Sequence, residues 1–500
     1  MSIRTRAWGQ VGMRAKRGQE ESFKTMPPLI PPDAVGLVPS EQAWNVPGAG
    51  VLIADDLPPT VLPTSQRVQA MALALLAKAV PNNQKLTRWD EQTATQELTD
   101  FLGSGGTKPV LWHDWRTDEG WARTFTQGPN AGDLHKEGDV WVVDASVLAL
   151  GERRPGVVPL GVKIAITVDD QGARPAWIQM EDGSRLAPDG ARWPFARIVA
   201  SAAMQNYVGT VRHVINLHYV AAQGIGVLVH NHLPWHHPVT RLMFPHSAGS
   251  LAVNWTANET FMGEGLLAEQ TYAFTWKGLQ QLVPLAFKAF SWDDYDMPEV
   301  FKRRGTLELI EKQQYPYGED ALLVWGVISS YVRDYLSQYY ADDAAVTADS
   351  ALQRALENLD PCLAKPVRAR TLAELTLVLT RFIHMVSVEH KLVSGIAYDY
   401  FTNPYYFPTL AREGKTAEEA VPYREEAENN VMFRYAISAM AWPLTADWSY
   451  VALDARGAEA MRRFRAALLK AGEEIDGRNR RRKVPFPHLH PSSLDTSVAV

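Results

Sequence analysis

The alternation of apolar and polar residues predicts a protein made mostly of long helices. In residues 322–339, apolar side chains recur every three or four positions, which is the spacing of an amphipathic helix. Residues 371–400 and 423–440 predict two further long helices, and the first of these is apolar on nearly all sides. Such a helix belongs in the middle of a bundle, because no face of it favours water. Residues 61–78 also have helical spacing in their second half.

A short β-rich insert interrupts the helical pattern. Residues 140–148 and 161–168 predict strands separated by turns, so residues 140–190 are interpreted as a small β-rich insert. Neither a linker rich in Gly, Ser or Pro nor an internal repeat divides the chain. We therefore expect a flexible tail over residues 1–30 and a single domain over residues 31–500.

Composition and charge exclude several classes of protein. The chain has 500 residues, of which 46% are hydrophobic and 21% charged, as in folded globular proteins. Its 50 basic and 56 acidic residues give a net charge of −6, which disfavours nucleic acid or an anionic membrane as a partner. The sequence has neither a stretch of roughly 18 apolar residues nor a signal peptide, so we expect a cytoplasmic protein with at most peripheral membrane contact. We also expect a monomer. The lone Cys362 leaves histidine and carboxylate as metal ligands.

Histidines are the first chemical signal, since seven of the thirteen lie between residues 213 and 246 and such clustering indicates a metal. The last five of the seven are interpreted as helix caps or surface residues: His230, His232, His236, His237 and His246. His213 and His218 instead lie in a segment of strong helical character. Five residues apart, they would lie about 140° apart on an α-helix, whereas a π-bulge brings positions i and i+5 onto one face. Shared ligation by this pair therefore predicts a π-bulge.

A second helix and the chain end supply further candidate ligands. His390 and Ser394 are four residues apart, so both project from one helix face. Each histidine taken alone has a plain alternative, a hydrogen-bonded core residue, but two apolar helices with inward histidines form a framework on which bundles hold iron. The chain ends on Val500 without a charged tail, which suits a buried carboxylate neutralised by a metal cation. A frayed, exposed end is the alternative.

Ordered motifs over roughly residues 110–500 match those of one known family. The matching segments are WRTDEGWARTFTQGPN (residues 115–130), Trp193 with Ala196 and Arg197, His213 with His218, LPWHHPVTRLMFPHS (residues 233–247), FKRRG, YPYGEDALLVWGVISSYVRDYLSQYYADD, His390 with Ser394, and the final LDTSVAV. In this order they resemble the lipoxygenases, non-haem iron dioxygenases of polyunsaturated fatty acids. The inverted order of Pro129 and Asn130 is a departure from the family pattern.

The resemblance implies a metal centre, a fold and an activity. The implied iron ligands are His213, His218, His390, the C-terminal carboxylate of Val500 and, as a weak or water-bridged fifth, Ser394. Manganese suits the same ligand types. The implied fold is a mostly α, lipoxygenase-like helical bundle around long central helices. In the implied reaction a ferric hydroxide removes a hydrogen from the methylene of a 1,4-pentadiene, and O2 adds to the resulting radical to give a conjugated hydroperoxide.

Some positions depart from the family and leave the substrate open. Two glutamines that link iron to the substrate pocket in lipoxygenases are replaced by Gly209 and Ala397. Such groups tune the orientation and potential of a metal centre, so their loss affects either the substrate or the rate. The position that correlates with product stereochemistry falls near Leu285 or Ala286. All four residues are candidate pocket positions.

Three alternatives to fatty-acid dioxygenation stay open, and the first is suggested by Gly209 and Ala397. The first is an oxygenase of the same fold that acts on another diene or a biosynthetic intermediate. The second is an isomerase or dehydratase of hydroperoxides that uses ferrous iron. The third is a non-catalytic lipid-binding homologue. The chain resembles a short form of the family that lacks the N-terminal β-barrel, and its basic residues 478–483 are interpreted as a solvated helix end, with a lipid headgroup or substrate carboxylate as the alternative contact.

Overall fold

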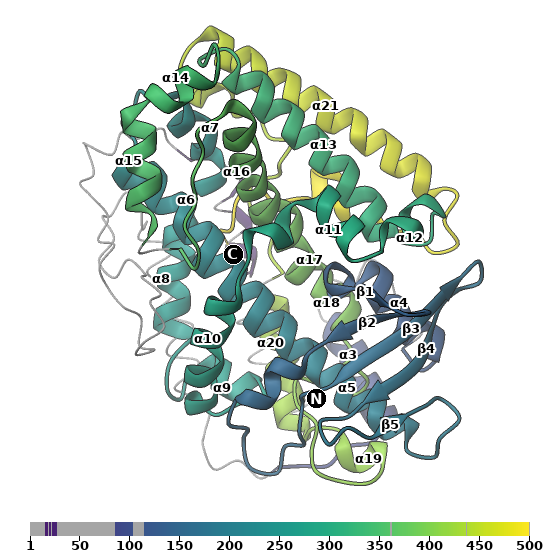
Figure 1. Ribbon diagram of the computed structural model, residues 1–500. Helices are drawn as coiled ribbons and strands as arrows, with labels where there is room; N and C mark the ends of the chain where they lie inside the picture. The colour runs from purple at the N-terminus through teal and green to yellow at the C-terminus, as the bar shows by residue number, and fades with distance from the viewer. Residues whose placement is uncertain are drawn as a thin grey trace.

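Most of the chain folds into helices, as the periodicity predicts. The computed structural model describes residues 16–18, 20–21, 23–27, 86–103, 115–360, 363–436 and 438–499, and Figure 1 shows long helices with a small sheet at one side. The α-helices are α3 (Glu91–Gly103), α4 (Asp118–Gln127), α5 (Trp193–Asn206), α6 (Gln223–Val227), α7 (Pro238–Ser247), α8 (Ser250–Thr260), α9 (Leu267–Thr271), α10 (Trp276–Ala289), α11 (Met297–Arg303), α12 (Leu307–Glu311), α13 (Pro316–Leu336), α14 (Asp343–Ala348), α15 (Ser350–Asn358), α16 (Leu372–His384), α17 (His390–Val393), α18 (Gly395–Phe401), α19 (Ala417–Ala420), α20 (Arg424–Ala436) and α21 (Ala455–Asn479). Within the described residues, three segments are π-helical: η4 (Tyr207–Ala222), η5 (Leu228–His232) and η8 (Met385–Glu389).

The β-rich insert is a single antiparallel sheet. Its strands are β1 (His135–Glu137), β2 (Val140–Asp144), β3 (Lys163–Asp169), β4 (Gly172–Gln179) and β5 (Arg185–Leu186), which pair in sequence order. The insert is confirmed, although it begins before residue 140. The first predicted strand is shorter than expected, because the chain turns at Ala145 into a 3-10 helix over Ser146–Leu150.

The predicted amphipathic helix over residues 322–339 is confirmed as α13, which begins earlier, at Pro316, and ends at Leu336. Proline suits the first turn of a helix, because its missing N–H has no partner there in any case. Trp325, Ile328 and Val332 are buried on the predicted apolar face. The longer α21 packs along α13, as Figure 1 shows at the upper right.

The helix predicted over residues 371–400 is present in three pieces joined by a π-turn and a break. A capping box starts α16, in which Thr371 and Glu374 exchange side-chain to backbone hydrogen bonds. The break falls at Ser394, whose hydroxyl donates to the carbonyl of His390 at 2.6 Å. This hydrogen bond to the preceding turn, followed by Gly395, accounts for the bend, since both features loosen a helix.

Two predicted segments fall largely outside the described residues, namely the helix over residues 61–78 and the tail over residues 1–30. Within the described part of the tail, the carbonyl of Thr25 accepts a hydrogen bond from the Trp442 indole at 2.9 Å, and the carbonyl of Pro27 accepts one from the Tyr450 hydroxyl at 2.7 Å. Among the described residues, no helix is both long and apolar enough to cross a membrane.

Candidate metal centre

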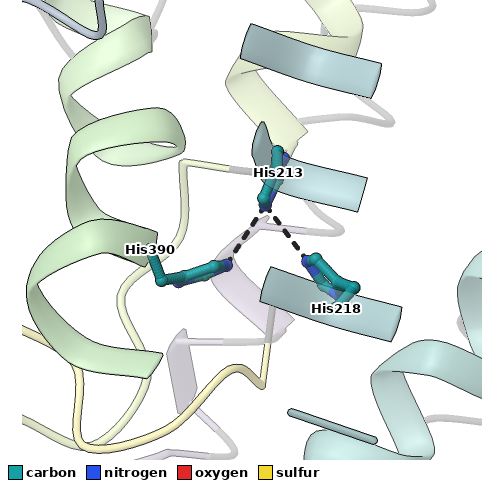
Figure 2. Close-up of side chains that lie close together, drawn as sticks. All are labelled: His213, His218 and His390. Carbon is teal, nitrogen blue, oxygen red and sulfur yellow. Dashed lines mark hydrogen bonds between the residues drawn. The ribbon is translucent and has the colours of Figure 1, made fainter. Parts of the chain in front are cut away.

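Three buried histidines from two helices converge on one point. His213 Nε2 lies 3.1 Å from His218 Nε2 and 3.2 Å from His390 Nε2, and the three ligand atoms all lie within 4.8 Å of one another. Figure 2 shows the three rings turned toward one another. His213 and His218 come from η4 and His390 from the start of α17. The structure therefore unites the three histidines that the sequence singles out.

The predicted π-helical distortion between His213 and His218 is confirmed. Both residues lie in η4, a 16-residue π-helix that continues directly from α5 and into α6. A π-helix brings positions five residues apart onto the same side, so the two rings share one face without a break in the helix. The π-turn η8 immediately precedes His390, so each of the two helices is distorted next to its histidines.

The histidines are neutral, as metal ligands must be. Burial lowers the pKa of His218 to about 4. Burial, together with the neighbouring histidines, lowers the pKa of His213 and His390 well below the ordinary value. An imidazole that stays neutral at physiological pH keeps one nitrogen lone pair for a metal.

One contact fixes which nitrogen of His218 carries that lone pair. Its Nδ1 lies 2.9 Å from Asn254 Oδ1, and the Asn254 amide nitrogen donates to the backbone carbonyl of His218 at 2.8 Å. The amide orientation is thereby set, so Nδ1 carries the proton and donates to Oδ1. The lone pair is left on Nε2, the atom that faces the other two rings.

The spacing of the three nitrogens fits a shared cation. Two nitrogens that each lie about 2.1 Å from one ion, at roughly a right angle, are about 3.0 Å apart. The observed separations of 3.1 and 3.2 Å match that geometry. Neutral imidazoles that direct lone pairs at one another repel, whereas a cation between them removes the repulsion. The donor set of three imidazoles therefore fits a first-row transition metal.

Comparison with known proteins decides the family. The family model described as Lipoxygenase matches residues 153–441, which is more than half of the chain. The chain belongs to the lipoxygenase family. The predicted mostly α, lipoxygenase-like fold is confirmed as well, because the solved structure of coral 8R-lipoxygenase superposes with a TM-score of 0.82, 18% sequence identity and coverage of 92% of this chain and 79% of that chain.

The curated relatives share about a quarter of their residues with this chain over the matched segments. The hydroperoxide isomerase ALOXE3 of Rattus norvegicus is 24% identical over 312 residues, which cover 58% of this chain and 44% of that protein. The linoleate 9/13-lipoxygenase of Pseudomonas aeruginosa is 24% identical over 383 residues, which cover 71% of this chain and 54% of that protein. The chain thus spans about half the length of the curated relatives that it matches.

Two of the lipoxygenase motifs meet in space and support the metal helices. The Trp193 indole and the Arg197 guanidinium both donate to Asp118 Oδ1, at 2.9 and 3.0 Å. Arg197 also donates to the carbonyl of Trp115 at 2.8 Å. These contacts join the start of α4 to α5, the helix that leads into η4. The motif residues therefore position the helix that carries His213.

The two other predicted ligands are Ser394, which the structure describes, and Val500, which it does not. The Ser394 hydroxyl gives its proton to the carbonyl of His390 and keeps its oxygen lone pairs, so its role as a weak ligand stays a prediction. Val500 lies outside the described residues. The residues before it are buried, with Val498 at 0% and Ala499 at 3% exposure. Ser497 donates to the carbonyl of Ala248 at 2.6 Å, so the chain runs inward up to its penultimate residue.

The four candidate pocket residues occupy different surroundings. Ala397 lines a cavity of about 20 Å³ that also borders His213. A Cβ added at Gly209 would lie 2.0 Å from the Tyr272 hydroxyl, so the tyrosine fills the space that a larger residue would need. Leu285 is 41% exposed and Ala286 is buried on α10, and neither lines this cavity.

A buried ion network, which the sequence reasoning did not find, ties the two metal helices together. Arg212 donates to Glu389 Oε2 at 2.5 Å and to the Asp133 carboxylate. Tyr317 donates to the other oxygen of Glu389. Burial raises the pKa of Asp133. Arg212 directly precedes His213, and Glu389 directly precedes His390. A charged residue beside each candidate ligand, on helices that are otherwise apolar, is the sequence signal that could have revealed this network.

Other basic residues have structural roles. His237 caps α7 and its Nε2 lies 2.8 Å from Asp349, which confirms a helix cap, whereas His246 is buried with its Nδ1 2.9 Å from the carbonyl of Thr496. In the basic cluster, Arg482 contacts the buried Asp320 at 2.7 and 2.8 Å, so this end of α21 is tied to α13 rather than solvated throughout.

Proposed function

We propose that this chain is a metal-dependent dioxygenase that adds O2 to a polyunsaturated fatty acid and forms a conjugated hydroperoxide. The observation that carries the proposal is the convergence of three neutral imidazole nitrogens at 3.1 and 3.2 Å in a buried site. Membership of the lipoxygenase family supports it, as does the name of the Pseudomonas aeruginosa relative, a linoleate 9/13-lipoxygenase. The net reaction adds one O2 to one 1,4-pentadiene.

Iron is the proposed metal, since imidazole ligands and a carboxylate suit non-haem iron. His213, His218 and His390 would hold it, with the carboxylate of Val500 as the anionic ligand. When bound, iron supplies the one-electron redox chemistry that a closed-shell protein side chain lacks. The protein's own contribution is to keep the three imidazoles neutral and in register on two helices that Arg212 and Glu389 join.

Metal analysis and oxygen uptake test this proposal together. We expect purified protein to contain about one iron per chain and to consume O2 with linoleic acid while absorbance from a conjugated diene rises in parallel. His390→Ala should lose both metal and activity. The matched control is His384→Ala, because His384 is equally buried but does not belong to the histidine cluster. Iron retained at the wild-type level in His390→Ala would contradict the proposed ligand set.

A second candidate function is isomerisation of fatty-acid hydroperoxides. The match to a hydroperoxide isomerase favours it, and so does the replacement of the two family glutamines by Gly209 and Ala397. This reaction consumes no O2. Incubation with linoleic acid hydroperoxide in a closed oxygen-electrode cell therefore separates the two functions: loss of hydroperoxide without oxygen uptake, and no reaction with linoleic acid, would assign the isomerase.

A further inference from the structure

The end of the chain is held between two other segments of the structure. On one side, the Thr496 backbone N–H donates to the carbonyl of Trp442 at 2.8 Å. On the other side, His246 Nδ1 donates to the carbonyl of Thr496 at 2.9 Å, and the Ser497 hydroxyl donates to the carbonyl of Ala248 at 2.6 Å. The last described residues are therefore fixed from two sides just before the chain ends.

The chain end packs against the helix that orients one of the histidines. Ala499 and the Trp442 ring both lie against Gly249, which precedes α8: a Cβ added at this glycine would lie 2.9 Å from the Ala499 Cβ and 3.7 Å from the Trp442 ring. Gly249 has a φ of 75°, which glycine adopts without strain. Asn254, further along α8, accepts the hydrogen bond from His218 Nδ1. The chain end thus approaches the histidine cluster along α8.

Trp442 also contacts a segment from the N-terminal part of the chain. Its indole N–H donates to the carbonyl of Thr25 at 2.9 Å, and its ring lies edge-on to the buried Phe23 ring with 4.8 Å between ring centres. We call residues 23–27 the N-terminal strap. Trp442 therefore binds this strap through its side chain, while its backbone carbonyl binds the chain end.

Other contacts keep the N-terminal part of the chain in place beside Trp442. The Tyr450 hydroxyl donates to the carbonyl of Pro27 at 2.7 Å. Lys16 donates to the Ser438 hydroxyl at 2.9 Å, and its ammonium group lies 4.7 Å from the centre of the Tyr435 ring. The N-terminal part of the chain thus lies along the same stretch of residues that pairs with the chain end.

We propose that the N-terminal strap holds the chain end in the metal centre, with Trp442 as the positioning residue through which the strap acts. A chain end ordinarily frays, because few contacts hold it, whereas a metal ligand has to stay in one place. Without the strap, the chain end would leave the centre more often and the metal would be lost faster. This inference rests on the proposed function, because it takes the carboxylate of Val500 as a ligand of the metal.

Release of the metal tests the strap without turnover. Iron-loaded protein is reduced and mixed with excess o-phenanthroline, whose coloured ferrous complex measures how fast iron leaves. Phe23→Ala removes the ring that packs against Trp442, so we expect iron to leave about tenfold faster or more. Trp442→Phe removes only the N–H that bonds the strap, and we expect release to become about two- to tenfold faster, the size of effect of one hydrogen bond. Phe23→Tyr keeps the ring and should restore nearly the wild-type rate.

Two control variants separate a positioning role from a general loss of stability. Trp89→Phe removes a comparable indole N–H, which donates to the carbonyl of Pro422 at 3.1 Å beside the start of α20, whereas Trp442 follows the end of that helix. Leu352→Ala leaves a cavity behind α15 and should lower the melting temperature. We expect both variants to release iron at the wild-type rate.

Electron paramagnetic resonance of the ferric protein reports the ligand geometry. We expect an altered spectrum in Phe23→Ala and the wild-type spectrum in Leu352→Ala. Wild-type release and a wild-type spectrum in both Phe23→Ala and Trp442→Phe would overturn the proposal. Release that accelerates equally in Leu352→Ala would overturn it too, because the strap would then act only through overall stability.

A combined variant tests whether the strap acts through the chain end. Residues appended after Val500 should by themselves accelerate iron release. In the extended chain, Phe23→Ala should add little, because the ligand that the strap holds is already displaced. Effects of the two changes that multiply in full would show that the strap acts elsewhere.

Oxygen uptake measured on the same samples separates the strap from the proposed function. Faster iron release and an altered spectrum in Phe23→Ala, in a protein that consumes no O2 with linoleic acid, would keep the strap and refute dioxygenation. Oxygen uptake by the wild type, together with iron release that neither Phe23→Ala nor Trp442→Phe alters, would refute the strap and keep dioxygenation.

Discussion

The ion pair between Arg212 and Glu389 should control both the stability of the protein and the metal site. The two residues are 5% and 1% exposed, and Arg212 also contacts the buried Asp133. Replacement of Arg212 by Met removes the only guanidinium that contacts both carboxylates among the described residues. Two buried carboxylates are then left without their ion-pair partner.

The expected cost follows from that geometry. Removal of one partner of a buried ion pair costs about 3–5 kcal/mol, because the remaining charge is uncompensated. Arg212→Met should therefore lower the free energy of unfolding by about that amount. Glu389→Gln leaves Arg212 paired with Asp133 and keeps a hydrogen-bonding group for Tyr317, so we expect a smaller loss of about 1.5–3 kcal/mol. The triple variant Asp133→Asn, Arg212→Met and Glu389→Gln removes the charges of all three residues and should recover most of the loss.

Urea denaturation of the metal-free proteins, followed by circular dichroism, measures these differences. The matched control is Arg462→Met, since Arg462 and Glu459 are both 51% exposed and an exposed ion pair contributes less than about 1 kcal/mol. Iron content of the folded variants reports separately on ligand geometry. A loss below about 1 kcal/mol in Arg212→Met, equal to that of the control, would refute the reasoning.

Three further predictions concern the chain end, a glycine and pH. Residues appended after Val500 should lower iron content and activity, and full retention of both would show that the terminal carboxylate is not a ligand. Gly209→Ala should lower the melting temperature, because its Cβ would lie 2.0 Å from the Tyr272 hydroxyl, whereas Gly326→Ala, which meets nothing within 4 Å, should raise it. The folded pKa of His218, about 4, lies below the unfolded value of about 6.5, so the unfolded chain binds more protons between these values. The free energy of unfolding of the metal-free protein should therefore fall as the pH drops from 6.5 to 4, and this group should contribute up to about 3 kcal/mol to the fall. Urea denaturation midpoints at several pH values measure the effect, and midpoints that do not change with pH would contradict the reasoning.

Local periodicity predicts helices and the faces that they bury, but not which faces meet. The five-residue spacing of His213 and His218 on one rigid segment was enough to predict the π-helical distortion, because the only way for both rings to share an ion was to change the helical repeat. By contrast, Arg212 and Glu389 are 177 positions apart, and their pairing depends on how two apolar helices pack. Nothing in the local pattern around either residue specifies that contact.

The break at Ser394 shows the same limit at shorter range. A serine followed by glycine in an otherwise apolar helix is compatible with a straight helix or a bent one. The hydrogen bond from its hydroxyl to the carbonyl of His390 selects the bent form, and the following helix α18 then turns its Ala397 toward the cavity beside His213. Tertiary packing decides between two conformations that the sequence permits almost equally.

The two positions at which a family glutamine is replaced, Gly209 and Ala397, both affect this cavity. The missing side chain of Gly209 gives space to the Tyr272 hydroxyl, and Tyr272 lines the cavity. Ala397 lines it too, and its carbonyl accepts from Arg434. A glutamine at either position would need space that Tyr272 already fills or that a cavity of about 20 Å³ does not offer. In the sequence, the two glutamines are simply missing. In the structure, the space that they would need lies beside Tyr272 and the buried Arg434, which line the same cavity as His213.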